Sequence, residues 1–181
     1  MERSQALAMT INPGTPASVD SIDRSEQCAI CKLHSDVEHL RGLEIWRSRH
    51  WLLRHHPHPS PLLGWCLLDA RRHLAGAIDF LGDEADEWGT VVQQASQLVK
   101  KVSGCDRVYL IAFGEGARHL HLHLIPRFQE DQRSSAWSVA DLYRDVEAGR
   151  QPVVQTEKVQ EFLLAARLQA QNGFTIGFNK S

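Results

Sequence analysis

Hydrophobic positions change their spacing along the chain, and these changes divide it into predicted elements. Two short apolar runs, at 43–46 and 51–54, flank a polar tripeptide and predict a β-hairpin. Residues 62–68 are apolar apart from Gly64 and are typical of a buried strand. Between 83 and 102 the apolar positions recur at helical spacing, with acids in the first turn and Gly104 after the last, which predicts the main helix.

Strand and helix patterns also divide the second half of the chain. Residues 107–113 and 119–125 predict two neighbouring antiparallel strands, the second ended by Pro126. Helical spacing then predicts a short helix at 139–147 and a longer one at about 157–171. These elements indicate an α+β fold, in which the main helix packs on an antiparallel sheet of about five strands. We expect a flexible tail at 1–24, a folded domain at 25–130, and a C-terminal helical extension at 131–181 packed on the same domain.

Composition restricts the class of protein but does not identify it. The 181 residues carry 20 basic and 22 acidic side chains, so we expect neither nucleic acid nor an anionic membrane as partner. Apolar runs reach about seven residues, far short of the ~20 that span a bilayer. The first 25 residues lack the apolar core of a secretory signal, so we expect a cytoplasmic protein. The unusual feature is 10 histidines, eight of them between His50 and His123.

Three of these histidines, His119, His121 and His123, alternate with leucines in one predicted strand. Successive strand residues point to opposite faces, so the leucines fit a core and the histidines share the other face. One alternative is that these histidines form a solvent-exposed strand face, but nothing about such a face requires three histidines, since Thr, Lys or Glu would serve equally well. A metal site built from all three is difficult, because the outer pair lies about 13 Å apart at Cα while zinc binds nitrogen at ~2.0–2.1 Å. At most two of the three are expected to share one metal ion. A third interpretation is nucleophilic, with one imidazole attacking an electrophile such as a phosphoryl group near pH 7.

The segment His-Leu-His-Leu-His-Leu-Ile, followed by Pro126-Arg127, resembles the signature of the histidine-triad superfamily of nucleotidyl hydrolases and transferases. The resemblance extends over residues 28–127 and implies a histidine-triad fold with a catalytic domain at 25–130. It implies that His121 attacks the α-phosphate of a nucleotide, that His123 lies beside the phosphate, and that His119 completes the triad. Relatives often form homodimers, and their catalysis needs no Mg²⁺ in principle.

The resemblance implies hydrolysis of nucleotide phosphoanhydrides or phosphoramidates, for example dinucleoside polyphosphates, through a nucleotidyl-histidine. Two alternatives remain open at this point. One is a nucleotidyltransferase that uses a phosphorylated acceptor. The other is a zinc-stabilised nucleotide-binding module without efficient turnover.

A cysteine pair, Cys28-x-x-Cys31, has the spacing of two ligands on one tetrahedral ion, with a redox pair as the alternative. A zinc site needs two more ligands, and the candidates are His34, His39, His73 and His119. Some members of the superfamily carry a similar cysteine pair, and resemblance to them implies that His73 and His119 complete a structural zinc site. His34 is the main rival of His73. We expect no organic cofactor.

The sequence departs from the family pattern at the predicted substrate contacts. The turn before the triad lacks the Asn and the Gly-Gln segment that relatives often carry, which leaves Arg118 and Gly116 as candidate contacts. An acidic residue commonly follows the hairpin in relatives, whereas this chain has Arg54-His55-His56, with His55 a further candidate. Such a basic segment favours a more anionic substrate. Otherwise, histidines in this Pro-rich loop are typically solvated or hydrogen-bonded locally.

Overall fold

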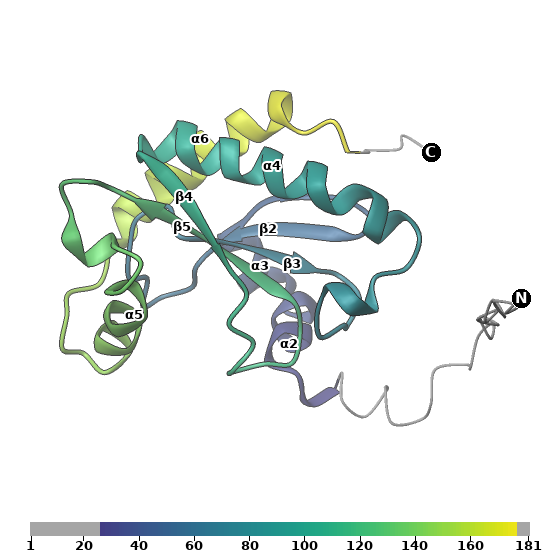
Figure 1. Ribbon diagram of the computed structural model, residues 1–181, viewed down its shortest axis with the longest axis horizontal. Coiled ribbons are helices and arrows are strands. Elements are labelled where there is room, and N and C mark those ends of the chain that lie inside the picture. The colour runs from purple at the N-terminus through teal and green to yellow at the C-terminus, as the bar shows by residue number, and fades with distance from the viewer. Residues whose placement is uncertain (1–25, 177–181) are drawn as a thin grey trace, which may run out of the picture.

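A five-stranded antiparallel sheet forms the centre of the computed structural model, which describes residues 26–176 (Figure 1). The predicted tail at 1–24 lies outside the described residues. The strand order is β1-β2-β3-β5-β4, and every neighbouring pair is antiparallel. The strands are β1 (Glu44–Arg47), β2 (Trp51–His55), β3 (Cys66–Ala70), β4 (Arg107–Ile111) and β5 (His121–Arg127). The predicted α+β class with about five strands is therefore confirmed.

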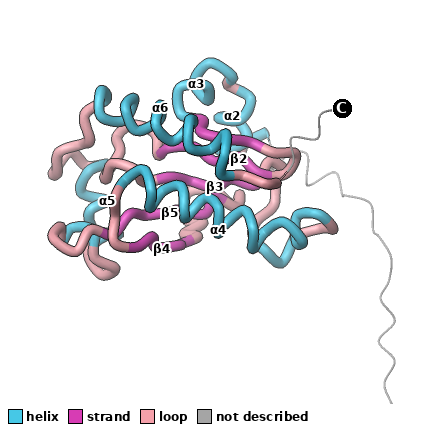
Figure 2. The backbone as a smooth tube through the Cα atoms, turned by 90° about the horizontal axis from the view of Figure 1, so that it is seen from above, coloured by secondary structure: helices cyan, strands magenta, loops and turns pink. Residues whose placement is uncertain are grey.

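Helices cover both faces of the sheet (Figures 1 and 2). The long helix α4 (Asp83–Ser103) and the C-terminal helix α6 (Thr156–Gly173) lie side by side on one face. On the other side lie α2 (Ala29–Ser35), α3 (Val37–Leu43) and α5 (Val139–Glu147). Single 3₁₀ turns occur at Ala77–Asp79 and Gln132–Ser134. None of the helices within residues 26–176 is long and apolar enough to cross a membrane.

The main core lies between the sheet and the α4–α6 layer. Leu120, Leu122 and Leu124 are all buried in it, which confirms the leucine face predicted for the triad segment. Helix α6 contributes Phe162 and Leu163 to the same core. A smaller apolar cluster on the opposite face includes Trp65 and side chains of α5. Burial of the leucines on one face turns the alternating histidines toward the other, where α2 and α5 flank them.

Several element boundaries differ from the sequence predictions. The apolar run at 62–68 is only partly a strand, because Gly64 takes a left-handed conformation (φ 81°) and β3 starts at Cys66. β4 ends at Ile111 instead of residue 113, and β5 starts at His121, so His119 precedes the strand. β5 also continues through Pro126 to Arg127. Proline is tolerated there because the β3–β5 ladder ends at Leu124, and only β4 pairs beyond it.

Candidate functional site

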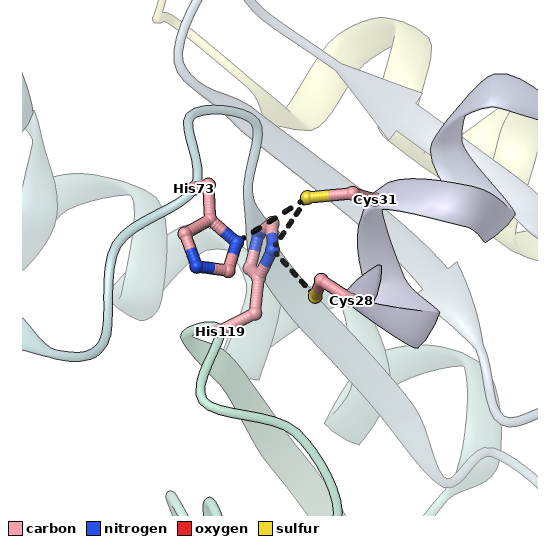
Figure 3. Close-up of side chains that lie close together, drawn as sticks. All are labelled: Cys28, Cys31, His73 and His119. Atoms are coloured by element: carbon pink, nitrogen blue, oxygen red, sulfur yellow. Dashed lines mark hydrogen bonds between the residues drawn. The ribbon is translucent and has the colours of Figure 1, made fainter. Parts of the chain in front are cut away.

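Four side chains from three separate segments meet at the N-terminal end of β5 (Figure 3). Cys28 immediately precedes α2 and Cys31 lies in its first turn, while His73 follows β3 and His119 precedes β5. Cys31 Sγ lies 3.3 Å from His73 Nδ1 and 3.4 Å from His119 Nδ1. Cys28 Sγ lies 3.5 Å from His119 Nδ1. One donor atom from each residue lies within 4.8 Å of the other three.

This Cys₂His₂ cluster fits a tetrahedral zinc ion. With Zn–S near 2.3 Å and Zn–N near 2.0–2.1 Å, the sulfur–nitrogen edge of the tetrahedron is about 3.5 Å, close to the separations above. His119 Nε2–H donates to the Ala70 carbonyl at 2.7 Å, which leaves the Nδ1 lone pair facing both sulfurs. Ligand histidines usually hold their second nitrogen in this way. Burial lowers the pKa of His119 to about 4, which favours the neutral, ligating form.

The rival ligand His34 lies beside this cluster but binds elsewhere. Its Nε2 lies 2.9 Å from Asp69 Oδ2, and its ring packs edge-on against His119. Of the four histidines considered from the sequence, the structure brings His73 and His119 to the cysteines. His39 lines a separate cavity.

Two triad histidines lie together on β5, with their ring centroids 5.2 Å apart. His121 Nδ1–H donates to the carbonyl oxygen of His119 at 2.5 Å. A carbonyl can only accept, so the hydrogen of the neutral ring is on Nδ1 and the lone pair is on Nε2. The ring is only half-buried. His121 therefore carries an oriented nucleophilic nitrogen.

His123 has the opposite tautomer. The indole Nε1–H of Trp65 donates to His123 Nδ1 at 3.0 Å, and an indole N–H can only donate. The neutral ring of His123 therefore carries its hydrogen on Nε2. Burial, followed by the neighbouring His121, His56 and Arg54, lowers the pKa of His123 to about 3. The pair thus combines a lone pair on His121 with a hydrogen-bond donor on His123.

An ion pair between β2 and β3 lies on the same sheet face. Arg54 donates to Asp69 from Nε at 2.6 Å and from Nη2 at 3.3 Å, and both side chains are almost completely buried. Asp69 is the register partner of His121 across the β3–β5 ladder. Arg54 Nη1 is buried and has no hydrogen-bond partner among residues 26–176. A buried donor of this kind is costly unless a ligand or water accepts from it.

The predicted substrate contacts occupy different environments. Gly116 and Arg118 are exposed in the loop before β5. His55 is fully buried, its Nδ1–H donates to the His56 carbonyl, and its Nε2 accepts from the Gly64 N–H. Its ring packs against Phe162 of α6, on the opposite face from His121. The expectation for His55 is therefore corrected, because strand alternation turns it into the core and both nitrogens are occupied.

His56, which follows β2, reaches the site instead. Its ring lies edge-on to Trp65 and to Tyr143 of α5, and it also lines a cavity of about 230 Å³. The cavity lies between α3, the loop after β2 and the start of α6; its lining residues are His39, Gly42, Leu43, His56, His58, Ser60, Val154, Thr156, Val159 and Gln160. Sequence reasoning missed Trp65 and Tyr143. Trp65 lies in the apolar run at 62–68, which predicts a buried strand, and Tyr143 lies outside the segment that carries the family resemblance.

Solved structures with a similar fold are histidine-triad proteins. A zinc-bound family member from Mycobacterium smegmatis has 17% identity and a TM-score of 0.59, covering 83% of this chain and 99% of its own. A hypothetical histidine triad nucleotide-binding protein from Sulfolobus tokodaii has 18% identity and a TM-score of 0.59, covering 80% and 93%. A Hit-like protein of Bartonella henselae, described as involved in cell-cycle regulation, has 16% identity and a TM-score of 0.56, covering 80% and 97%.

The chain therefore has the histidine-triad fold, with its triad motif at the start of β5. The predicted resemblance is confirmed at the level of the fold. No family model matches the sequence, and no curated protein matches it either.

Proposed function

We propose that this protein hydrolyses nucleotide phosphoanhydrides, such as dinucleoside polyphosphates, through a nucleotidyl intermediate on His121. The observation that carries the proposal is the hydrogen bond from His121 Nδ1–H to the His119 carbonyl. It holds the ring in one orientation and keeps the lone pair on Nε2, with the centroid of the His123 ring 5.2 Å from that of His121. Such fixed geometry is the main source of catalysis in transfers of this kind.

The reaction has two steps. His121 Nε2 attacks the α-phosphorus, an N–P bond forms, and the P–O bond to the departing phosphate breaks with its electron pair on that oxygen. His123 Nε2–H donates a hydrogen bond to a phosphate oxygen and stabilises the developing charge. Water then attacks phosphorus, the N–P electron pair returns to His121, and a proton of the water passes to solvent.

Positive and hydrogen-bond-donating groups near the triad support an anionic substrate. Among residues 26–176, Arg54 Nη1 has no hydrogen-bond partner, and the carboxylate that pairs with Arg54, Asp69, is shared with His34. The 230 Å³ cavity shares His56 with the triad cluster and supplies a partly apolar space for the nucleoside. Arg118 and Gly116, in the exposed loop before β5, remain our proposed contacts for the outer phosphates.

The decisive experiment looks for the covalent intermediate. The protein is mixed with diadenosine tetraphosphate, quenched in milliseconds and analysed by mass spectrometry for a nucleotidyl adduct. We expect an adduct in the wild type and in His34→Ala, and neither adduct nor turnover in His121→Ala. Unchanged turnover in His121→Ala would refute the proposal. Adding phosphorylated acceptors to the same assay distinguishes a hydrolase, which releases the nucleoside monophosphate, from a transferase.

We further propose that Cys28, Cys31, His73 and His119 hold a structural zinc ion. With four protein ligands the site has no open position, so the ion would join α2 to the start of β5 and take no part in the reaction. Zinc measured in purified wild type should be about one ion per chain, and Cys28→Ser should lose most of it. Cys105→Ser is the control, because Cys105 is buried away from the cluster. Equal, near-zero zinc in all three proteins would contradict the site.

We also propose a homodimer. β4 is an edge strand of the sheet, and its Leu110 is 46% exposed. Exposed edge strands readily pair with a second strand. Light scattering of the wild type should give twice the 20.4 kDa chain mass, and Leu110→Lys should shift it toward the monomer. A monomeric wild type at micromolar concentration would contradict this.

A further inference from the structure

Trp65 restricts the protonation state of His123, because the indole N–H can donate a hydrogen bond but cannot accept one. The Trp65 Nε1 to His123 Nδ1 bond is 3.0 Å long and both residues are buried. Protonating His123 would add a hydrogen to Nδ1, opposite the indole hydrogen. Two donors would then face each other, the bond would be lost, and a buried N–H would be left without an acceptor.

The other groups around His123 also favour its neutral form overall. Its ring contacts His121 on its own strand, Phe113 in the loop after β4, His56 after β2, and Tyr143 on α5. Asp69 on β3 favours the charged form of His123, but burial and the positive or titratable neighbours His121, His56 and Arg54 oppose it, and its pKa falls to about 3. Asp69 is also already paired with Arg54 and His34.

From this geometry we infer that Trp65 keeps His123 a neutral hydrogen-bond donor, so that the site cleaves only bonds whose leaving group departs without a proton. The inference rests on the proposed function and deepens it. A phosphate leaves a phosphoanhydride as a stable anion, and the electron pair of the broken P–O bond stays on oxygen. The amine of a phosphoramidate must instead gain a proton as the P–N bond breaks, and a neutral imidazole is a poor source of one. Phosphoanhydrides, and esters of acidic alcohols, are therefore the substrate class.

The test measures cleavage of substrates that share the same AMP group and differ only in the leaving group attached to its phosphorus. The substrates are diadenosine tetraphosphate, adenosine 5′-phosphoramidate, and the 4-nitrophenyl and phenyl esters of AMP. We compare kcat/KM, which includes every step up to departure of the leaving group when that departure is irreversible. In the wild type we expect the phosphoanhydride to exceed the phosphoramidate by at least about 100-fold, and the nitrophenyl ester to exceed the phenyl ester strongly, since general acid catalysis contributes about 10²- to 10⁴-fold.

The variant Trp65→Phe keeps an aromatic ring but removes the N–H. In this variant a hydrogen on His123 Nδ1 no longer meets a second donor, although burial, His121, His56 and Arg54 still oppose the charged form. An unsatisfied buried donor costs about 1–3 kcal/mol, so we expect phosphoramidate cleavage to rise relative to phosphoanhydride cleavage by about 10-fold. Trp51→Phe is the matched control. Trp51 is also fully buried, but it packs against Trp88 and Phe80 in the core on the α4 side, and its Nε1 contacts no triad residue. Wild-type ratios in Trp65→Phe would overturn the inference.

A second measurement does not depend on the variant folding. Nitrogen-15 NMR of wild-type His123 should show one neutral tautomer, with the hydrogen on Nε2, from pH 5 to pH 8. Titration of His123 within this range would overturn the inference, as would equal wild-type rates on phosphoramidate and phosphoanhydride. If a His121 adduct forms but the rates are equal, this inference fails alone. If no substrate forms an adduct, the proposed function fails, and this inference fails with it.

Discussion

Replacing Arg54 with methionine should destabilise the protein strongly, because it breaks the ion pair that joins β2 to β3. The exposed fractions of the Arg54 and Asp69 side chains are 2% and 0%, so water cannot replace the lost partner. Of its side-chain donors in the described part of the chain, Asp69 would lose those at 2.6 Å and 3.3 Å and keep His34 at 2.9 Å. The variant therefore leaves a buried carboxylate with a single partner.

The size of the effect follows from the electrostatics of Asp69. Burial alone would raise the pKa of Asp69, but the charge of Arg54 and the hydrogen bonds from His34 and Arg54 lower it from 3.8 to about 2. This difference corresponds to about 2 kcal/mol of stabilisation of the carboxylate. Breaking a buried ion pair costs about 3–5 kcal/mol, and His34 remains, so we expect about 3 kcal/mol for Arg54→Met. For a domain of this size that lowers the melting temperature by about 10 °C.

The assay is urea and thermal unfolding at pH 7 in the presence of zinc. The double variant Arg54→Met/Asp69→Asn removes both charges and should recover about 2 kcal/mol relative to Arg54→Met, because replacing both members of a buried pair costs far less than removing one. An unfolding free energy of Arg54→Met within about 1 kcal/mol of the wild type would contradict a stabilising ion pair. A double variant less stable than Arg54→Met would contradict it as well.

Two further predictions concern pH and backbone conformation. Because the folded-state pKa of Asp69 lies below its ordinary value, its contribution to stability is present above about pH 4 and is lost as pH falls through 2. The stability advantage of the wild type over Arg54→Met/Asp69→Asn should shrink over that range, and an advantage that stays constant would contradict the assignment. Gly64→Ala should cost about 1–3 kcal/mol in urea unfolding, since φ is 81° and the new Cβ would lie 3.0 Å from Phe162 Cε2. Gly89→Ala, in open space on α4, should be neutral or stabilising, and equal effects of the two substitutions would argue against strain at Gly64.

The main elements could be predicted from the sequence because their patterns are long or specific. The helix at 83–102 has acids, apolar spacing and a terminal glycine that all agree, and the structure has α4 at Asp83–Ser103. Helices α2 and α3 were missed, because each has only seven residues and the polar segment offers too few turns for a periodic signal. Asp36, whose carboxylate accepts from the His39 N–H, was their one local signal.

Strand alternation explained part of the candidate site and failed for the rest. It placed His121 and His123 on one face and the leucines in the core, as observed. It could not show that β5 starts only at His121. The expectation for His55 was wrong because the resemblance to the family took precedence over alternation, which places His55 on the face opposite Arg54. The tautomers of His121 and His123 could not be predicted from the sequence either. They depend on the Trp65 indole and on the His119 carbonyl oxygen, which only the folded chain brings to these rings.

His119 connects the proposed zinc site to the proposed nucleophile, because its ring faces Cys28 and Cys31 while its carbonyl oxygen accepts from His121 Nδ1–H. Removing zinc should therefore loosen the backbone that orients His121. A misplacement of about 1 Å can cost about 100-fold in rate, so we expect the single-turnover rate of adduct formation to fall by about 10- to 100-fold after chelation. Nucleotide binding, measured by calorimetry with AMP, should change less, because the 230 Å³ cavity contains none of the four cluster residues. A zinc-free protein that forms the adduct at the full rate would show that the position of His121 is independent of His119.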